Sequence, residues 1–317
     1  MSNNPPLSPF FKGGGSKYRS QEIMKDVGGQ AVIEGVMMRA GNVWTVAVRN
    51  PEKEIVIKKE GVRQLPRPLK LPLLRGVVAL VQSLSIGIRA LLYSAEASGH
   101  EGEKPSSVSL FFTVFVAFVI GIGLFLLFPL YATKLLGSVF LSINNSSFIF
   151  NFVDGIIRVL VFLIYILSIN MSKEIRRVFQ YHGAEHKAVH AYEAGEELTP
   201  ENADKYSTLH PRCGTSFLLI VMMMSILIFS LIPKEWLFIW KFLSRIILMP
   251  LIAGVSYEFI KFSSKRMKNP LVRFAAAPGL WLQKLTTGKP SHDQIEVAVR
   301  ALKEVLETGE KEINVVG

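Results

Sequence analysis

Two histidines one helical turn apart, with a glutamate beside the second, make Tyr181–Lys187 the segment of this sequence best suited to chemistry. It reads Y-H-G-A-E-H-K, so His182 and His186 stand at positions i and i+4. On a helix this spacing puts both imidazoles on one face, about 6 Å apart at the backbone, as a chelating pair. The order H-x-x-E-H is that of inverzincin peptidases, in which the histidines bind zinc and the glutamate is the general base. We therefore predict a divalent metal, most simply zinc, on His182 and His186, with Glu185 as a catalytic base.

The predicted metal needs a third protein ligand, and an open fourth position if the site is catalytic. His210 and Cys213 come just before an apolar segment, and the loop that leads to them can fold back onto the histidine pair. His190 lies about 12 Å from His182 along a helix and is not expected to share its metal. Further oxygen donors are available as Glu34, Glu193 and Glu258.

Each of these residues also has a structural interpretation. The histidine pair can simply be solvated at the level of the lipid headgroups. Cys213 can be a small buried residue at a helix start. The two remote carboxylates, Glu34 and Glu258, can be ion-pair partners of Arg39 or Arg212.

Long uncharged segments indicate that these residues belong to an integral membrane protein. Half of the chain, 50%, is hydrophobic. Ser109–Leu130 and Gly214–Pro233 carry no charge, and each is long enough to cross a hydrocarbon core of about 30 Å as a helix. Two further spans are predicted at Phe148–Met171 and Leu237–Ile260. The fold class is therefore mainly α, with four transmembrane helices.

The charges inside the last two predicted spans have to be explained. Asp154 and Arg158 stand at i,i+4 near one end of their span and can pair on one helix face. Lys241, Arg245 and Glu258 lie toward the ends of the other span, where long side chains can reach the interface. No charge is expected near the bilayer midplane, which argues against a transporter.

The net charge of +11 indicates membrane topology rather than binding of nucleic acid. Of the 36 Lys and Arg residues, 15 lie in residues 1–107, 6 in 172–213 and 10 in 261–317, whereas the connections 131–147 and 233–236 hold one each. By the positive-inside rule, both termini and the middle loop face the cytoplasm, in the plasma (bacterial inner) membrane. A single cysteine excludes an internal disulfide bond.

The chain divides into five predicted parts around this membrane domain. A β-hairpin is predicted from Trp44–Arg49 and Glu54–Lys59, which flank a turn-rich insert, and Ser291–Gln294 starts a helix as a capping box. The parts are a disordered tail (1–23), a small cytoplasmic β-rich region (24–70), an interfacial amphipathic or re-entrant helix (71–107), a four-helix membrane domain with the cytoplasmic His/Glu/Cys loop 172–214 (108–262), and a cytoplasmic interfacial segment with a soluble tail helix (263–317).

Four motifs resemble the YqhQ-like bacterial membrane family, the domain of unknown function 1385. They are Gly28–Arg39, Tyr181–Lys187, Leu209–Phe217 and Pro278–Gln283, and the resemblance runs from about Met24 to Leu306. The resemblance implies a metal-dependent enzyme of unnamed substrate. It favours His182, His186, His210 and Cys213 as metal ligands and adds Glu34 to Glu185 as a catalytic residue, whereas His190 lies outside the shared pattern.

The leading hypothesis is a membrane-embedded, metal-dependent enzyme with a zinc hydrolase-type site at the cytoplasmic membrane face. Such a placement suits a lipid-linked or membrane-protein substrate, because a soluble substrate would need no membrane anchor. The alternative is a non-enzymatic assembly or sensing protein whose metal is structural. The substrate and the oligomeric state are not determined by the sequence.

Overall fold

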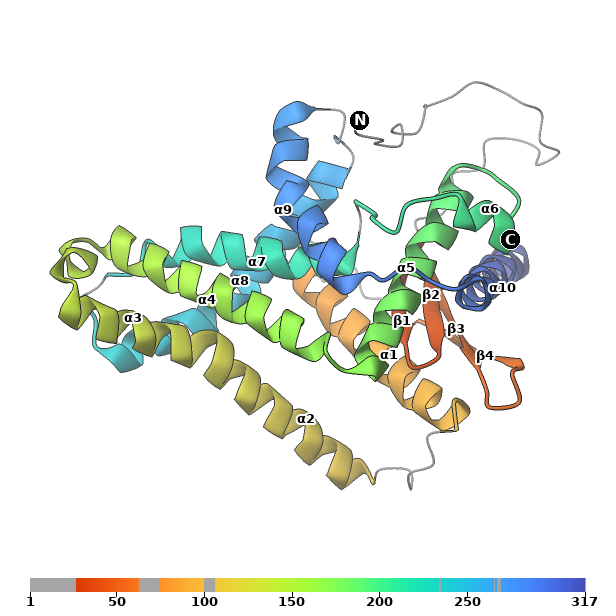
Figure 1. Ribbon diagram of the computed structural model, residues 1–317, viewed down its shortest axis with the longest axis horizontal. Helices are drawn as coiled ribbons and strands as arrows, with labels where there is room; N and C mark the ends of the chain where they lie inside the picture. Colours follow the sequence, from red (N-terminus) through yellow and green to blue (C-terminus); the bar gives the residue numbers. More distant parts are fainter. Residues whose placement is uncertain are drawn as a thin grey trace.

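The computed structural model places a bundle of apolar helices at one end of an elongated molecule and a small α/β unit at the other (Figure 1). The structure describes residues 27–62, 74–99, 106–211, 213–233, 235–264, 266 and 269–316. The predicted disordered tail, 1–23, lies outside the described residues. The mainly helical fold with a small N-terminal sheet is confirmed.

The N-terminal region is a four-stranded antiparallel sheet of two successive hairpins. The hairpin predicted around Asn50 is confirmed, with Val48 opposite Val56, and the Asn50 side chain accepts a hydrogen bond from the backbone N–H of Glu54 in the turn. The preceding hairpin adds two strands, so that the sheet order follows the chain. The strands are β1 (Val27–Val32), β2 (Gly35–Ala40), β3 (Val43–Arg49) and β4 (Ile55–Gly61).

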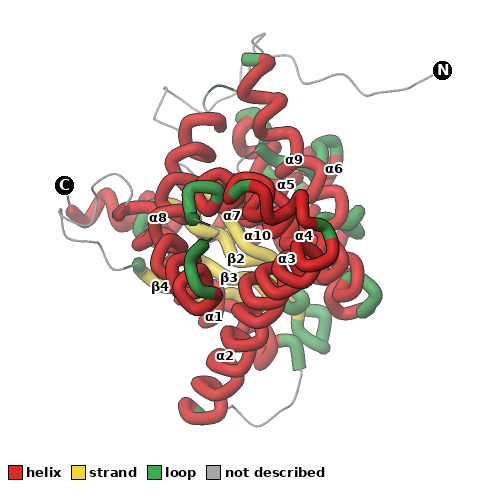
Figure 2. Tube along the Cα trace, turned by 90° about the vertical axis from the view of Figure 1, so that its left-hand side faces the viewer, coloured by secondary structure: helices red, strands yellow, loops and turns green. Residues whose placement is uncertain are grey.

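Helices cover both faces of this sheet, as Figure 2 shows in the end view. One face packs on α5 (Lys173–Glu193) and α10 (His292–Val316), and the other on α1 (Leu74–Ala97). Because both faces are covered, nearly every residue of the two central strands is buried, which removes the alternation of polar and apolar residues that a half-exposed strand shows.

The C-terminal helix α10 begins with the predicted capping box. The Ser291 backbone N–H donates to Gln294 Oε1 at 2.9 Å, and the Gln294 N–H donates to Ser291 Oγ at 3.4 Å. The helix is not a separate tail, because Ile295 and Leu302 are fully buried between the sheet and α5. Thr45 of β3 donates a hydrogen bond to the Ala301 carbonyl at 2.8 Å. Both ends of the chain therefore build one core.

Helix α1 joins the membrane bundle to the sheet. Near its start, a Cβ on Gly76 would lie 3.0 Å from Tyr257 of α8. In its second half, Ile86 and Ala90 are buried against the sheet, and Ser94 Oγ accepts a hydrogen bond from the Ile33 N–H at 3.2 Å. Length and composition alone would allow α1 to cross a membrane, but half of the helix is occupied by the sheet. Its interfacial position stays a prediction.

The remaining apolar helices form the bundle. Among the described residues, four helices are long and apolar enough to span a membrane, at Arg75–Ala97, Phe111–Val139, Ser147–Ile169 and Phe238–Ser263. Four helices of this kind were also predicted, but the two sets differ by one helix. The predicted span Gly214–Pro233 is not among the four, because the apolar part of α7 is shorter, at Phe217–Phe229, and α1 takes its place. The bundle elements are α2 (Ser107–Ile122), η2 (Gly123–Leu127), α3 (Phe128–Val139), η3 (Leu141–Asn145), α4 (Ser147–Ile169), α7 (Gly214–Phe229), α8 (Phe238–Ser264) and α9 (Pro270–Thr286).

A charged network lies inside the bundle, and it corrects two expectations. The predicted pair is present, with Arg158 Nη2 2.7 Å from Asp154 Oδ2, but Arg158 is the twelfth of the 23 residues of α4 and so lies near its middle. Arg245 is fully buried, and its Nη1 lies 2.7 Å from Asp154 Oδ1. Arg245 therefore does not reach toward an interface. Its guanidinium pairs with the buried Asp154 carboxylate, as that of Arg158 does.

Candidate metal centre

Helix α5 carries the candidate site, and its second half is enclosed on all sides. The helix starts at Ser172, whose hydroxyl accepts a hydrogen bond from the Ile175 N–H. Every residue from Tyr181 to Val189 is buried. Gly183 permits a close approach of the segment before α10, since a Cβ at this position would lie 2.2 Å from the Gly288 carbonyl oxygen. Polar side chains in this stretch are therefore removed from water and need protein partners or a ligand.

Three of the predicted ligands come together in one group. The ligand atoms of His182, His186 and Cys213 all lie within 4.8 Å of one another, with His182 Nε2 3.2 Å from Cys213 Sγ. Zinc bonds of about 2.0–2.3 Å in a tetrahedron would place neighbouring donor atoms about 3.3–3.6 Å apart. Two imidazoles and a thiol in this arrangement fit such an ion with little movement.

The backbone fixes the orientation of both imidazoles. His182 Nδ1 lies 2.7 Å from the Thr286 carbonyl oxygen, and His186 Nδ1 lies 2.5 Å from the Thr208 carbonyl oxygen. A carbonyl can only accept, so both Nδ1 atoms carry the hydrogen and a neutral ring has its lone pair on Nε2. Ligating histidines in metalloproteins are held by the same kind of outer contact.

The charge state of His186 suits a ligand. Burial lowers the pKa of His186, which favours the neutral ring that can bind a cation. Its Nε2 atom is buried and makes no hydrogen bond of ordinary geometry within the described part of the chain, although Cys213 is close enough to influence the pKa. A lone pair turned toward a thiol in a dry environment can serve as a metal ligand.

The Glu185 side chain of α5 points at the sheet. A Cβ added to Gly29 of β1 would lie 2.9 Å from the Glu185 carboxyl carbon and Oε1, so glycine is needed there for the carboxyl to fit. Burial raises the pKa of Glu185 to about 7, and the His182 charge acts in the opposite direction. The predicted base is thus a buried carboxyl next to the first histidine.

The structure places His210 in a second group. Its ligand atom lies within 4.8 Å of those of His190 and Glu193, with His210 Nε2 3.2 Å from Glu193 Oε1. The ring of His210 is 5.7 Å from that of His186 and 4.5 Å from that of His190. Sequence spacing separated His190 from His182 correctly but did not indicate that His210 would join His190.

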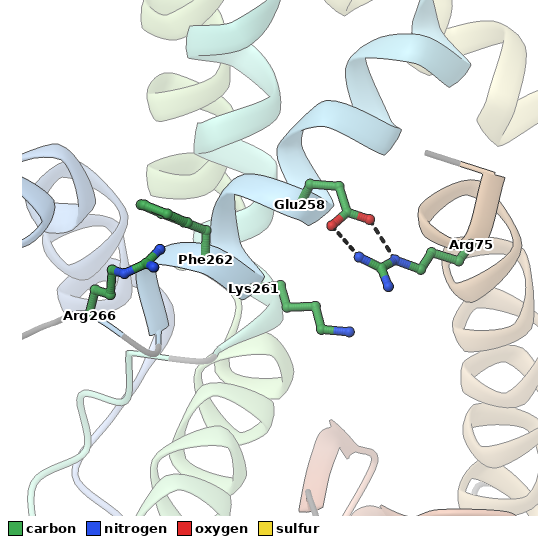
Figure 3. Close-up of a pocket in the computed structure, with 5 residues that line it drawn as sticks. All are labelled: Arg75, Glu258, Lys261, Phe262 and Arg266. Carbon is green, nitrogen blue, oxygen red and sulfur yellow. Dashed lines mark hydrogen bonds and ion pairs between the residues drawn. The ribbon is translucent and has the colours of Figure 1, made fainter. Parts of the chain in front are cut away.

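The two remote carboxylates lie elsewhere, because each has its own arginine. Glu34, in the turn between β1 and β2 with a φ of 50°, accepts from Arg177 Nη2 at 2.6 Å and from the Tyr181 hydroxyl at 3.3 Å. It fastens the hairpin to α5. Glu258 of α8 accepts from Arg75 Nε at 2.6 Å, in a pocket also lined by basic side chains (Figure 3). Neither carboxylate is among the two groups of donors.

Comparison with known proteins assigns a family. The model of the family described as "Protein of unknown function (DUF1385)" matches residues 71–308. The chain belongs to this family. It is 32% identical over 296 residues to the "Uncharacterized protein YqhQ" of Bacillus subtilis (strain 168), which covers 88% of this chain and 92% of that protein. No solved structure matches.

The family assignment confirms the resemblance noted in the sequence, and the matched residues include the potential metal ligands. Both groups of potential ligands, and the Thr208 and Thr286 carbonyls that orient the first, lie within the matched residues 71–308. Gly29 and Glu34 precede them. Neither the family's name nor the relative's name states an activity or a metal, so the geometry of the site is the basis for its chemistry.

Proposed function

We propose that this chain is a membrane-embedded, metal-dependent enzyme of the hydrolase type, with a divalent metal, most simply zinc, on His182, His186 and Cys213. One observation carries the proposal. The two imidazoles have Nδ1 fixed on backbone carbonyls, and Nε2 of His182 lies 3.2 Å from the Cys213 sulfur. The single S–H of Cys213 can donate to only one of the two Nε2 atoms at a time, whereas a cation bound by the thiolate would serve both.

The donor set favours catalysis because it has three members within the part of the chain that the structure describes. Catalytic zinc sites use three protein ligands and keep a position for water or substrate, whereas structural sites are closed by four. A metal bound here would supply a Lewis acid and lower the pKa of water. Glu185, buried beside His182, would accept a proton at its carboxylate as the general base. His182 and His186 would hold the metal ion.

The position of the donors between membrane helices indicates the substrate class. α5 follows α4 after the short turn Asn170–Ser172, and α7 begins at Gly214, directly after Cys213. The positive-inside rule puts this junction at the cytoplasmic face of the plasma membrane, with both termini on the same side. A lipid-linked or membrane-protein substrate is the class that such a site can reach.

A structural metal site in an assembly or sensing protein is the second candidate. Burial favours it, since the exposed fractions of His182, His186 and Cys213 are only 8%, 2% and 8%. A metal there would fasten α5 to the start of α7. The two candidates differ in Glu185, which only an enzyme requires.

Metal analysis of the full chain, purified in mild detergent from metal-replete medium, tests the proposal. We expect bound zinc in the wild type, its loss from the first group in His182→Ala, and no loss in His292→Ala, whose side chain is exposed on α10. Wild-type protein without metal would overturn both candidates.

The Glu185→Gln variant separates the two candidates. As an enzyme, it keeps its metal but fails to restore a strain that lacks the gene, because loss of a general base costs about 10²–10⁴-fold in rate. Full restoration by Glu185→Gln with normal metal content would leave only the structural role.

A further inference from the structure

A second group of donors continues along α5 from the first. His190 and Glu193 stand at i,i+3 on the last turns of the helix, and His210 comes from the loop after α6 (Pro200–Asp204). Their ligand atoms lie within 4.8 Å of one another. We propose that His190, Glu193 and His210 bind a second divalent metal ion, so that the chain holds a two-metal centre. This inference rests on the proposed function of the first group.

The position of His210 is fixed by its backbone rather than by its ring. Gln283 of α9 accepts from the His210 N–H at 2.8 Å and donates to the His210 carbonyl at 2.8 Å. All of these groups are buried. A side-chain amide that clamps both backbone groups of one residue leaves the imidazole of His210 directed at α5, where Glu193 Oε1 lies 3.2 Å from Nε2.

The tautomer of His190 is also set by the backbone. Its Nε2 lies 2.9 Å from the Leu209 carbonyl oxygen, so Nε2 carries the hydrogen and Nδ1 has the lone pair. The same device orients His182 and His186 in the first group, through the opposite ring nitrogen. All three histidines of α5 therefore have one ring nitrogen on a backbone carbonyl, which makes the other ring nitrogen the acceptor.

The donors of the second group define the kind of ion. Two imidazoles and one carboxylate form the ligand set of His₂Glu zinc sites and of the 2-His-1-carboxylate iron(II) sites. The first group contains a sulfur donor and is softer. The second group therefore suits a borderline divalent ion such as Zn²⁺ or Fe²⁺, and a set of three donors leaves room for substrate or water.

The two groups are neighbours. Ring centroids are 4.4 Å apart for His182 and His186, 5.7 Å for His186 and His210 and 4.5 Å for His190 and His210. The four imidazoles thus form one continuous row at the junction with the membrane helices. Adjacent metal sites in hydrolytic enzymes bind one substrate together.

Metal stoichiometry of the purified full chain decides the inference. We expect about two divalent ions per chain in the wild type, about one in Glu193→Gln and about one in His182→Ala. The exposed-histidine control His292→Ala should keep both. A wild type with about one ion, unchanged in Glu193→Gln, would overturn the second site and leave the first intact. A wild type with no ion would overturn the proposed function itself.

Cobalt(II) substitution gives a second readout, and its first measurement needs only the wild-type chain. Cobalt bound beside a thiolate shows a sulfur-to-cobalt charge-transfer band, and cobalt on nitrogen and oxygen ligands does not. Titration of the wild-type chain should therefore give one equivalent with the band and one without it. Cys213→Ser should abolish the band and keep visible absorption from the second site. If every bound cobalt ion showed the band, the second site would not exist.

Discussion

The charged network of the bundle and the histidine cluster of α5 are two buried polar clusters of the described chain that are built in opposite ways. In the bundle, Asp154 contacts Arg158 and Arg245 through its two oxygens, and the guanidiniums also stack on Phe229. On α5, the histidines have their N–H groups on backbone carbonyls and direct their other nitrogens at one another and at Cys213. The first cluster joins opposite charges, whereas the second gathers two imidazole acceptors around one thiol.

The difference separates a structural cluster from a ligand site. Arg158 also donates to Ser225 of α7 at 2.8 Å and to the Phe125 carbonyl in η2 at 2.9 Å, so three elements are held by one side chain. The charged side chains of this bundle network form ion pairs with one another. This pairing disfavours the transporter alternative, even though Arg158 lies near the middle of α4.

The largest expected effect is on the stability of the bundle. Asp154→Asn would leave two buried guanidiniums without their shared carboxylate and lower the free energy of unfolding by about 3–5 kcal/mol. Thermal unfolding in detergent measures the loss, and Glu296→Gln, which removes a half-exposed partner of Arg49, should cost only about 0–1 kcal/mol. Metal content per folded chain should not change; a large loss of metal would show that the two clusters are coupled.

Gly29→Ala should act on the site without changing any ligand. Its Cβ would lie 2.6 Å from the Met37 carbonyl oxygen and 2.9 Å from the Glu185 carboxyl, so we expect a loss of about 1–3 kcal/mol from overpacking. Gly28→Ala is the matched control, because nothing lies within 4 Å of its Cβ. Equal melting temperatures for the two variants would contradict the close approach of Glu185 to β1.

Glu34→Gln should have a smaller effect. It removes an ion pair with Arg177, whose side chain is 53% exposed, and exposed pairs contribute about 0–1 kcal/mol. Metal content should remain at the wild-type value, since Glu34 is not among the donors. Loss of a metal ion in this variant would restore the catalytic role that the family resemblance implied for it.

The smallest expected effect concerns the residues that orient the histidines. Thr208 and Thr286 act through backbone carbonyls, so Thr208→Ala and Thr286→Ala should leave the metal content unchanged within error. Elemental analysis beside the wild type provides the check. A clear drop in either variant would mean that the side chain, and not the main chain, controls the site.

Much of the site could be predicted from spacing. The i,i+4 histidines and the glutamate between them lie on one helix, so helical geometry alone places them on one face. Cys213 could also be predicted as a ligand, because it directly precedes the apolar segment that forms α7. The groups that orient the rings could not be predicted, because the acceptors are main-chain carbonyls of Thr208 and Thr286, and a backbone carbonyl leaves no trace in residue type.

The sequence by itself determined the apolar helices, the second hairpin, the capping box of α10 and the histidine pair, because each depends on residues close together in the chain. Only the tertiary structure decided which histidines His210 would join, that α10 packs on the sheet, and that Arg245 meets Asp154 across 91 positions. These contacts follow from how helices pack, and local pattern does not specify the rotation or the depth at which two distant helices meet.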